Sequence, residues 1–407
     1  MQTTTTGVTV GLTVVLGTVN LGFGWCIGSV LLVAGGAVGL CYGLVRVAYH
    51  RRRRSAREAP AHPAPAPASI AHPPAPRAVA DPTDTAALVE QMLAQGRYAL
   101  LLRPQLAGNL SDALFQRTLQ ALEKHMALVP DGEVLLGRTC EEEESSEAPL
   151  PPQRVVRVER FFLDRYPVTN REYYEFVAAG GYEQMSLWEE AVWLAVLDMM
   201  DRTGSPGPRY WRHGCFLPGE EHYPVVGVSW YEAAACARWL GKRLPSDAEW
   251  VKAGSWPVPV CAQTRAQRKY PWGDTMDRTR ANLWGAGPNC IVPVDQFAGG
   301  VSVGGVYQLI GNVWEWTSGG FRPADHPAGE MLLPTAMKSI RGGAFDTYFD
   351  NQATCQFQSG ENPLHRRHNI GFRCAVGVCD LQLARPGAAQ AKLLPQEPLP
   401  TTEEVLA

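Results

Sequence analysis

The sequence lacks the features by which several common protein classes are identified. Its 407 residues include ten cysteines but no C-x-x-C pair, which argues against a zinc ribbon and a thioredoxin-type redox motif. The formal net charge is only -3, so no basic excess points to a nucleic-acid partner. No internal repeat is visible either. What remains is an apolar content of 45%, which is enough for an ordinary globular core.

Charge is almost absent from Gly7 to Ala48, where Arg46 is the single charged residue. A bilayer core needs about 20 apolar residues per helix, and this run is roughly twice that length. It therefore predicts either one long tilted membrane helix or a hairpin of two short ones that turns near Asn20–Trp25. A cleaved secretory signal is disfavoured, because Met1-Gln2 supplies no basic start.

A basic run, Arg51 to Arg54, follows the apolar segment. Under the positive-inside rule it marks the cytoplasmic flank, although a solvated charge run in a linker fits the same position. We therefore expect residues 1–54 to anchor the chain in a bacterial inner membrane. The globular part is then expected in the cytoplasm, with a periplasmic location as the alternative.

The remaining chain divides by composition into four parts. Residues 55–82 are rich in Pro and Ala and predict an extended, polyproline-like linker. Residues 83–125 have a helical pattern with Ser111 as a cap, and residues 126–379 form the expected globular domain. Residues 380–407 have the composition of a disordered tail.

Helix starts are the clearest local signals within the globular domain. A Ser or Thr is followed three residues later by Glu, as a capping box requires, at Thr169 and Glu172, Ser229 and Glu232, and Ser246 and Glu249.

The tryptophans and arginines predict hydrogen bonds from side chains to the backbone or to carboxylates. Buried tryptophans need acceptors for their indole N–H groups. We expect Arg341 and Arg373 to hold loops through carbonyls or through carboxylates such as Asp247 or Glu249.

An ordered series of blocks then carries a family resemblance. The blocks include Tyr223–Lys252, Gly311–Trp316, Arg341–Gly343 and Asn369–Cys374. Together they resemble the formylglycine-generating, or sulfatase-modifying factor, family over roughly 250 residues of the chain. The resemblance implies an α+β architecture of the C-type-lectin-like FGE-sulfatase fold, with short strands, a few helices and many irregular loops.

The chain departs from this family at its reactive centre. The resemblance implies a cysteine pair shortly after the Gly-Gly, near Trp314, because thiolates bind copper(I). Thr347 and Gln352 stand at the two cysteine positions, and Ala344 replaces an assisting serine. A hydroxyl and an amide cannot replace thiolates, which argues against copper and predicts a pseudoenzyme.

Other implied ligands and bonds are partly retained. A family calcium loop maps onto Gln308, Gly311, Val313 and Glu315, which predicts one calcium ion. A second calcium site, beginning at Asn282 and Leu283, lacks its acidic loop. Cys355, His365 and His368 offer an alternative metal set, although their spacing fits no defined site.

The resemblance also implies two disulfide bonds in secreted relatives. One would join Cys236 to Cys374, and the other would need a cysteine at Gly254, unless Cys261 pairs with Cys355 instead. In the cytoplasm these groups would remain thiols.

Two function classes follow. The first is a non-oxidising module that binds a protein or peptide through the loop Ala344–Arg367, whose aromatic and basic content is typical of interfaces. Its candidate contact residues are Tyr348, Phe349, Phe357, His365, Arg366 and Arg367.

The second class is an enzyme of altered mechanism. It would either modify sulfatase-like peptides or use an oxygen-activating metal held by histidines. The resemblance places such histidines in an added helical bundle of distant relatives, whereas residues 83–124 here carry no histidine and only His125 lies at their edge.

Overall fold

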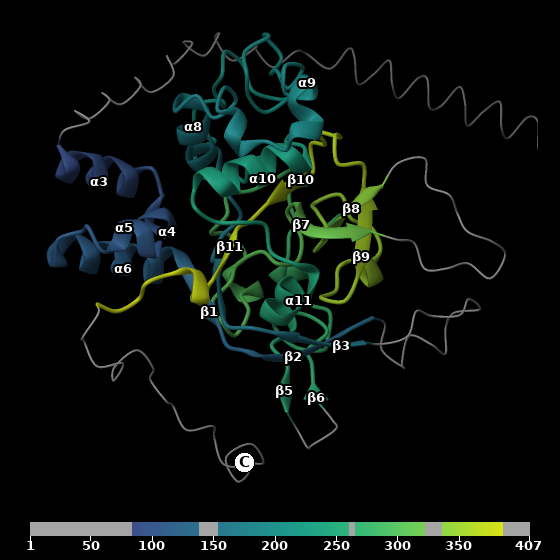
Figure 1. Ribbon diagram of the computed structural model, residues 1–407. Coiled ribbons are helices and arrows are strands. Elements are labelled where there is room, and N and C mark those ends of the chain that lie inside the picture. Colours follow the sequence, from purple (N-terminus) through teal and green to yellow (C-terminus); the bar gives the residue numbers. More distant parts are fainter. Residues whose placement is uncertain (1–83, 138–153, 260–264, 322–335, 386–407) are drawn as a thin grey trace, which may run out of the picture. The chain divides into compact units, whose positions relative to one another are not determined.

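The computed structural model describes residues 84–137, 154–259, 265–321 and 336–385 (Figure 1). Its elements are short, with a longest described helix of 14 residues and a longest described strand of 8. This mixed α+β organisation agrees with the predicted fold class. Within those four ranges, no helix has the length and apolar character needed to cross a bilayer. The predicted anchor, linker and most of the predicted tail lie outside the described residues.

Four helices form the N-terminal part of the described chain. They are α3 (Thr85–Ala94), α4 (Tyr98–Leu101), α5 (Pro104–Ala107) and α6 (Asp112–His125). The predicted cap is confirmed, since the Ser111 hydroxyl accepts a hydrogen bond from the Leu114 backbone at 3.4 Å. The helices bury Phe115 and Leu122 in one cluster with residues of β1, β4 and β11, so they are packed on the strands of the domain.

A buried polar contact strengthens this packing. The Lys242 ammonium donates to the Asp164 carboxylate at 2.7 Å and to the Tyr98 hydroxyl at 2.8 Å. Both charged side chains are almost fully buried, so the pair compensates the cost of removing each charge from water.

The start of the predicted tail is corrected by the structure. The Gln382 backbone donates to the Leu102 carbonyl at 2.8 Å, and the Arg385 guanidinium donates to the Ala107 carbonyl at 3.0 Å. Leu381 is buried in the same cluster as the helices. Residues 380–385 therefore belong to the folded part, because apolar contacts outweigh the polar composition around them.

Two larger sheets organise the domain. The first is antiparallel, in the order β1 (Met126–Val129), β4 (Phe161–Asp164) and β11 (Ala375–Gly377). The second has the order β10 (Ile370–Phe372), β7 (Trp314–Phe321), β8 (Met337–Arg341) and β9 (Gln358–Glu361), with β10 parallel to β7. Two antiparallel pairs complete the sheets, namely β2 (Gly132–Leu136) with β3 (Arg154–Val158), and β5 (Val258–Pro259) with β6 (Arg265–Ala266).

Four further helices pack around these sheets. They are α8 (Asn170–Ala178), α9 (Trp193–Val196), α10 (Trp230–Trp239) and α11 (Asp247–Ser255). All three predicted capping boxes are present, at the starts of α8, α10 and α11. Short 3₁₀ turns occur at Met185–Leu187, Glu190–Val192, Arg278–Arg280, Ala298–Gly300, Asp350–Gln352 and Val378–Asp380.

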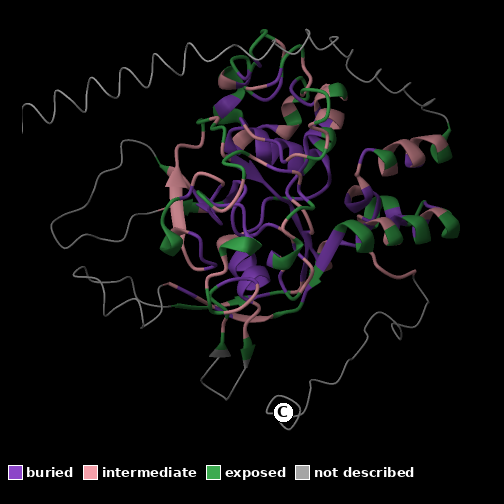
Figure 2. Ribbon diagram, turned by 180° about the vertical axis from the view of Figure 1, so that it is seen from behind, coloured by how far each residue is buried: buried purple, intermediate pink, exposed green. Residues whose placement is uncertain are grey.

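Helices α10 and α11 lie among the most buried parts of the domain (Figure 2). Tryptophans in their surroundings find the acceptors that burial requires. The Trp230 indole donates to the Thr317 carbonyl at 2.7 Å, and the Trp316 indole donates to the Val228 carbonyl at 3.2 Å. The prediction that buried indole N–H groups find acceptors is therefore confirmed for both rings.

Candidate functional site

The parallel pairing of β7 and β10 brings together two blocks that are distant in sequence, Gly311–Trp316 and Asn369–Cys374. Trp314 pairs with Ile370 and Trp316 with Phe372. At the end of β8, Gly342 and Gly343 have φ values of 96° and 76°, a region that favours glycine. A Cβ at Gly342 would lie 2.4 Å from the Leu309 carbonyl oxygen, so glycine is also required by close approach.

The two degenerate cysteine positions follow this turn. The Thr347 hydroxyl accepts a hydrogen bond from the Ala344 backbone at 2.8 Å, and both residues are buried. Gln352 ends the 3₁₀ turn and is only partly buried. The Thr347 hydroxyl thus closes a backbone turn, which is a structural role. A hydroxyl is not a soft metal ligand.

The three buried thiols among the described cysteines are poorly suited to replace the lost pair. Cys355 is fully buried, and burial raises its pKa far above the ordinary thiol value. Burial likewise raises the pKa of Cys236 and Cys374 well above that value, and both are free thiols. Since the thiolate is the nucleophile and the metal ligand, burial keeps all three groups in their unreactive form. Cys261 lies outside the described residues.

The predicted contact residues separate into exposed and structural groups. Tyr348 and Phe349 are 63% and 60% exposed, with ring centroids 5.1 Å apart in an edge-to-face arrangement. His365 and Arg367 are also exposed, and both bond to the Glu361 carboxylate at 2.8 Å. These four residues are available to a partner.

Arg366 and Phe357, two other predicted contact residues, make contacts inside the domain. The Arg366 guanidinium is largely buried and pairs with Glu232 at 2.9 Å while donating to the Met200 carbonyl at 2.8 Å. Phe357 packs against the Trp314 ring, with centroids 6.1 Å apart. Both side chains fasten the loop to the core, a role that composition cannot distinguish from surface binding.

Trp284 is an exposed aromatic residue near this loop that sequence reasoning did not select. It is 48% exposed, and its backbone N–H donates to the Thr347 carbonyl at 3.2 Å. It therefore lies next to the loop that carries Tyr348. The available signal was the block Ala281–Trp284, which resembles the family and gives no information on exposure.

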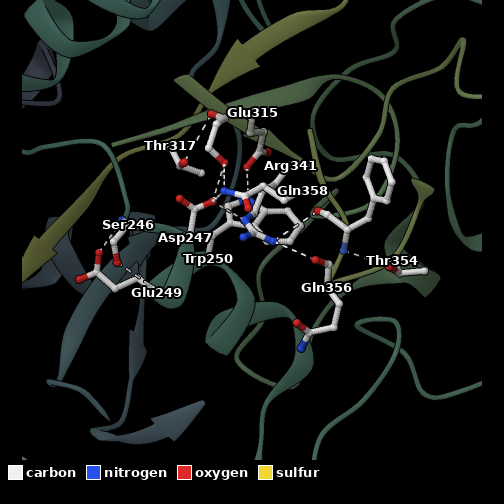
Figure 3. Close-up of polar contacts among 12 residues, drawn as sticks. Ser246, Asp247, Glu249, Trp250, Glu315, Thr317, Arg341, Thr354, Gln356 and Gln358 are labelled. Carbon is white, nitrogen blue, oxygen red and sulfur yellow. Dashed lines mark hydrogen bonds and ion pairs between the residues drawn. The ribbon is translucent and has the colours of Figure 1, made fainter. Parts of the chain in front are cut away.

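A polar network fixes the base of the same loop (Figure 3). Asp247 accepts hydrogen bonds from the Ser339 hydroxyl at 2.6 Å and from the Arg341 guanidinium at 2.5 Å. Arg341 also donates to the carbonyls of Gln356 and Phe357 at 3.2 and 3.3 Å. The prediction that both arginines hold loops through carbonyls or carboxylates is confirmed. Arg341 pairs with Asp247. Arg373 pairs with Glu315 and also donates to the backbone carbonyls of Asp164 at 3.0 Å and Tyr307 at 2.7 Å.

The proposed calcium ligands do not fit a calcium ion. The Glu315 carboxylate accepts hydrogen bonds from Arg373 at 2.6 and 2.7 Å and from the Trp250 indole at 2.8 Å. The Gln308 carbonyl oxygen accepts from the Asn312 amide at 2.7 Å, and the Gly311 carbonyl accepts from the Val313 backbone at 2.9 Å. The oxygens of Gln308, Gly311 and Glu315 are therefore already engaged with donors, and a fixed guanidinium neutralises the carboxylate.

The Gln308 amide takes over a bridging role in this loop. Its N–H₂ group donates to the carbonyls of Pro293 at 2.9 Å and Gln296 at 3.1 Å. Two carbonyl oxygens thus converge on an amide nitrogen, which joins Gln308 to the segment Pro293–Gln296.

We therefore expect calcium to leave the stability of the chain unchanged. A ligand that binds only the native state raises stability by about 2.7 kcal/mol at one hundred times its dissociation constant. Thermal unfolding in millimolar calcium and in excess chelator should give the same midpoint, with magnesium as the control cation. A calcium-specific rise of the midpoint would show that the donor network rearranges around the ion.

The His and Cys alternative is not assembled either. Among the described ranges, no group of three His, Cys, Asp or Glu side chains is arranged to hold a metal. His365 bonds to Glu361, and His368 lies 3.7 Å from the Asp346 carboxylate.

Comparison with known proteins gives the family. A model of the sulfatase-modifying factor enzyme 1-like domain matches residues 111–378. Hercynine oxygenase of Mycolicibacterium thermoresistibile is 33% identical over 256 residues, covering 58% of this chain and 55% of the relative. The inactive C-alpha-formylglycine-generating enzyme 2 of Bos taurus is 30% identical over 285 residues, covering 62% of this chain and 88% of the relative.

The chain spans about half the length of the hercynine oxygenase it matches. Among solved structures, PvdO from Pseudomonas aeruginosa aligns over 61% of this chain and 93% of its own, at 22% identity and a TM-score of 0.40. The match at residues 111–378 and the bovine relative show that this chain belongs to the sulfatase-modifying factor enzyme 1-like domain family, as a divergent member with Thr347 and Gln352 at the cysteine positions.

Proposed function

We propose that this chain is a membrane-anchored, non-oxidising member of its family that binds a protein or peptide. The observation that carries the proposal is the hydrogen bond that the Thr347 hydroxyl accepts. This hydroxyl closes a buried turn at the position of a reactive thiol, while the next two residues, Tyr348 and Phe349, face solvent. The loop thus has a structural contact where the resemblance implies a metal ligand, and it presents two exposed rings of the kind found at interaction sites.

The relatives support a role that does not depend on one reaction. The same domain aligns with proteins named as an oxygenase, as an inactive formylglycine-generating enzyme and, at 30% identity over 268 residues, as a serine/threonine-protein kinase of Chlamydia pneumoniae. A scaffold found beside different activities is suited to recognition, because function resides in the sites placed on it.

The membrane part of the proposal rests on the sequence. The apolar segment from Gly7 to Ala48 would anchor the chain in a bacterial inner membrane, and Arg51 to Arg54 would keep the domain on the cytoplasmic side. In that compartment Cys236 and Cys374 would stay reduced.

An oxygenase with altered metal binding is the second candidate, favoured by the identity to hercynine oxygenase. Against it, His125 is the single histidine of the described N-terminal helices, and it stacks on the Tyr98 ring with centroids 5.7 Å apart. Burial lowers the pKa of His125, so the ring favours its neutral form. One neutral imidazole on an aromatic ring does not make a histidine metal site.

The test uses the full chain in detergent, supplied with copper and then with iron, on a cysteine-containing sulfatase peptide. Mass spectrometry should show the peptide thiol unchanged with either metal. Conversion of the thiol to an aldehyde, or tight stoichiometric iron with oxygen consumption, would replace the binding proposal by an enzymatic one. Peptide capture from a random library then tests the binding site with two matched double variants. Tyr348→Ala/Phe349→Ala should lose peptide capture. Leu194→Ala/Leu197→Ala, the control, should keep it.

A further inference from the structure

Three exposed arginines without an acidic partner lie between residues 202 and 212, and we call Arg202, Arg209 and Arg212 the arginine cluster. All three side chains are exposed. Among the described residues, none of their guanidiniums forms an ion pair or donates a hydrogen bond. Guanidiniums that the domain does not use are available to oxyanions of a partner.

The backbone brings the three arginines onto neighbouring turns. The Arg202 N–H donates to the Trp211 carbonyl at 3.2 Å, which places Arg202 beside the residue that precedes Arg212. The Arg202 guanidinium lies over the Tyr210 ring, 5.4 Å from its centroid, and Tyr210 directly follows Arg209. Arg202 is therefore joined by contacts to the segment that carries the other two arginines.

The carboxylate next to Arg202 in sequence serves another purpose. Asp201 is buried and accepts hydrogen bonds from the backbone N–H groups of Thr203 at 2.7 Å, Ser205 at 3.1 Å and Gly214 at 2.8 Å. Its oxygens close the turn, and it forms no ion pair with Arg202. The cluster thus keeps its guanidiniums free beside an acidic residue.

The Tyr210 ring holds the Arg202 guanidinium on a fixed support. A Cβ at Gly227 would lie 2.6 Å from a carbon of this ring, so the ring packs directly on the glycine backbone. The Tyr210 hydroxyl also donates to the Arg366 carbonyl at 3.4 Å. A guanidinium stacked on a fixed ring has less conformational freedom to lose when it binds an anion.

The cluster lies beside the end of the loop Ala344–Arg367. The Arg209 N–H donates to the Gly227 carbonyl at 2.9 Å, and the Gly227 N–H donates to the Arg367 carbonyl at 2.8 Å. Arg209 and Arg367 therefore flank the same glycine. Arg367 is already paired with Glu361, whereas Arg209 adds positive charge without a partner at this edge of the loop.

Acidic peptides have the chemistry that fits such a surface. The planar guanidinium donates two parallel hydrogen bonds to a carboxylate or a phosphate, and arginine clusters recur at sites that recognise acidic and phosphorylated motifs. Charge complementarity also suppresses wrong partners, since a basic peptide would be repelled by three cations.

We propose that the arginine cluster binds the carboxylate or phosphate groups of an acidic peptide. The proposal rests on the binding function proposed above and names the chemical class of the peptide.

The experiment titrates three fluorescent synthetic peptides of equal length against the natural full chain in detergent and reads binding as anisotropy. One peptide alternates glutamate and glycine, one alternates phosphoserine and glycine, and the control alternates glutamine and glycine. At an ionic strength of about 0.15 M, at least one acidic peptide should bind about tenfold more tightly than the control, and the tighter one identifies the oxyanion. If neither acidic peptide binds more tightly than the glutamine peptide, the proposal is wrong.

Two double variants locate the contact. Arg202→Gln/Arg209→Gln should weaken binding of the acidic peptide by about tenfold, because two charge-assisted contacts are lost. Arg154→Gln/Arg157→Gln changes the net charge equally at two exposed arginines of β3 and should weaken binding by less than about threefold. Circular dichroism verifies that both variants are folded. Equal losses in the two variants, or no loss in the first, would overturn the arginine cluster as the site.

A random-peptide selection on the natural full chain separates this proposal from the broader one. Binders that depend on Tyr348 and Phe349, lack acidic residues and tolerate Arg202→Gln/Arg209→Gln would keep the binding function and overturn the acidic class. Acidic-peptide binding that persists when no binder depends on Tyr348 and Phe349 would support the arginine cluster and overturn only the proposed loop.

Discussion

Replacing Gly254 by cysteine is expected to create a disulfide bond with Cys355 and to stabilise the domain. An ideal Cβ on Gly254 would lie 3.8 Å from the Cys355 Cβ, which equals the mean separation of about 3.8 Å in natural disulfides. The bond would close a loop of about 100 residues. Chain-entropy models give about 4.7 kcal/mol for such a loop, and engineered bonds commonly deliver about 2–4 kcal/mol.

The measurement is thermal unfolding of Gly254→Cys under mild oxidation, with the cross-linked peptide identified by mass spectrometry. A gain of this size should raise the midpoint by about 5–10 °C, and a reductant should abolish the gain. Gly254→Cys/Cys355→Ala is the matched control, because it carries the new side chain without a bonding partner. An oxidised chain with the cross-link but an unchanged midpoint would contradict the expected stabilisation.

Breaking the Glu315 and Arg373 pair is expected to cost the most stability of any single polar change considered. Both side chains are almost completely buried, and two hydrogen bonds of 2.6 and 2.7 Å join the guanidinium to the carboxylate. Arg373→Met leaves the Glu315 charge buried with only the Trp250 indole as a donor. Removing one member of a buried ion pair typically costs about 3–5 kcal/mol.

Urea unfolding of Arg373→Met, Glu315→Gln and the double variant measures this coupling. The double variant should lose less free energy of unfolding than the two single losses added together, because no uncompensated charge remains. The matched control is Arg367→Met, which breaks the exposed pair with Glu361 and should cost less than about 1 kcal/mol. Equal losses at the buried and exposed pairs would refute the proposed difference.

Local sequence patterns predicted the helix starts well. The boxes at Thr169, Ser229 and Ser246 each satisfy two backbone or side-chain donors within four consecutive residues. Such contacts need no information from elsewhere in the chain.

Exposure within the candidate site could not be predicted in the same way. Arg366 and Arg367 are neighbours with identical side chains, yet Arg366 is buried against Glu232 and Arg367 is exposed beside Glu361. Phe349 and Phe357 differ in exposure as well, because the Phe357 ring packs against Trp314 at the start of β7. The difference lies in partners that are distant in sequence.

The amino-acid sequence by itself determined the family, the mixed α+β class, the helix caps and the loss of the thiol pair at Thr347 and Gln352. Each of these depends on residue identity or on short spacings along the chain. Only the tertiary structure decided that Glu315 is neutralised by Arg373, that Gly254 faces Cys355, and that Trp284 lies beside the Tyr348 loop. Those contacts join residues tens of positions apart, and their formation depends on how the whole core packs.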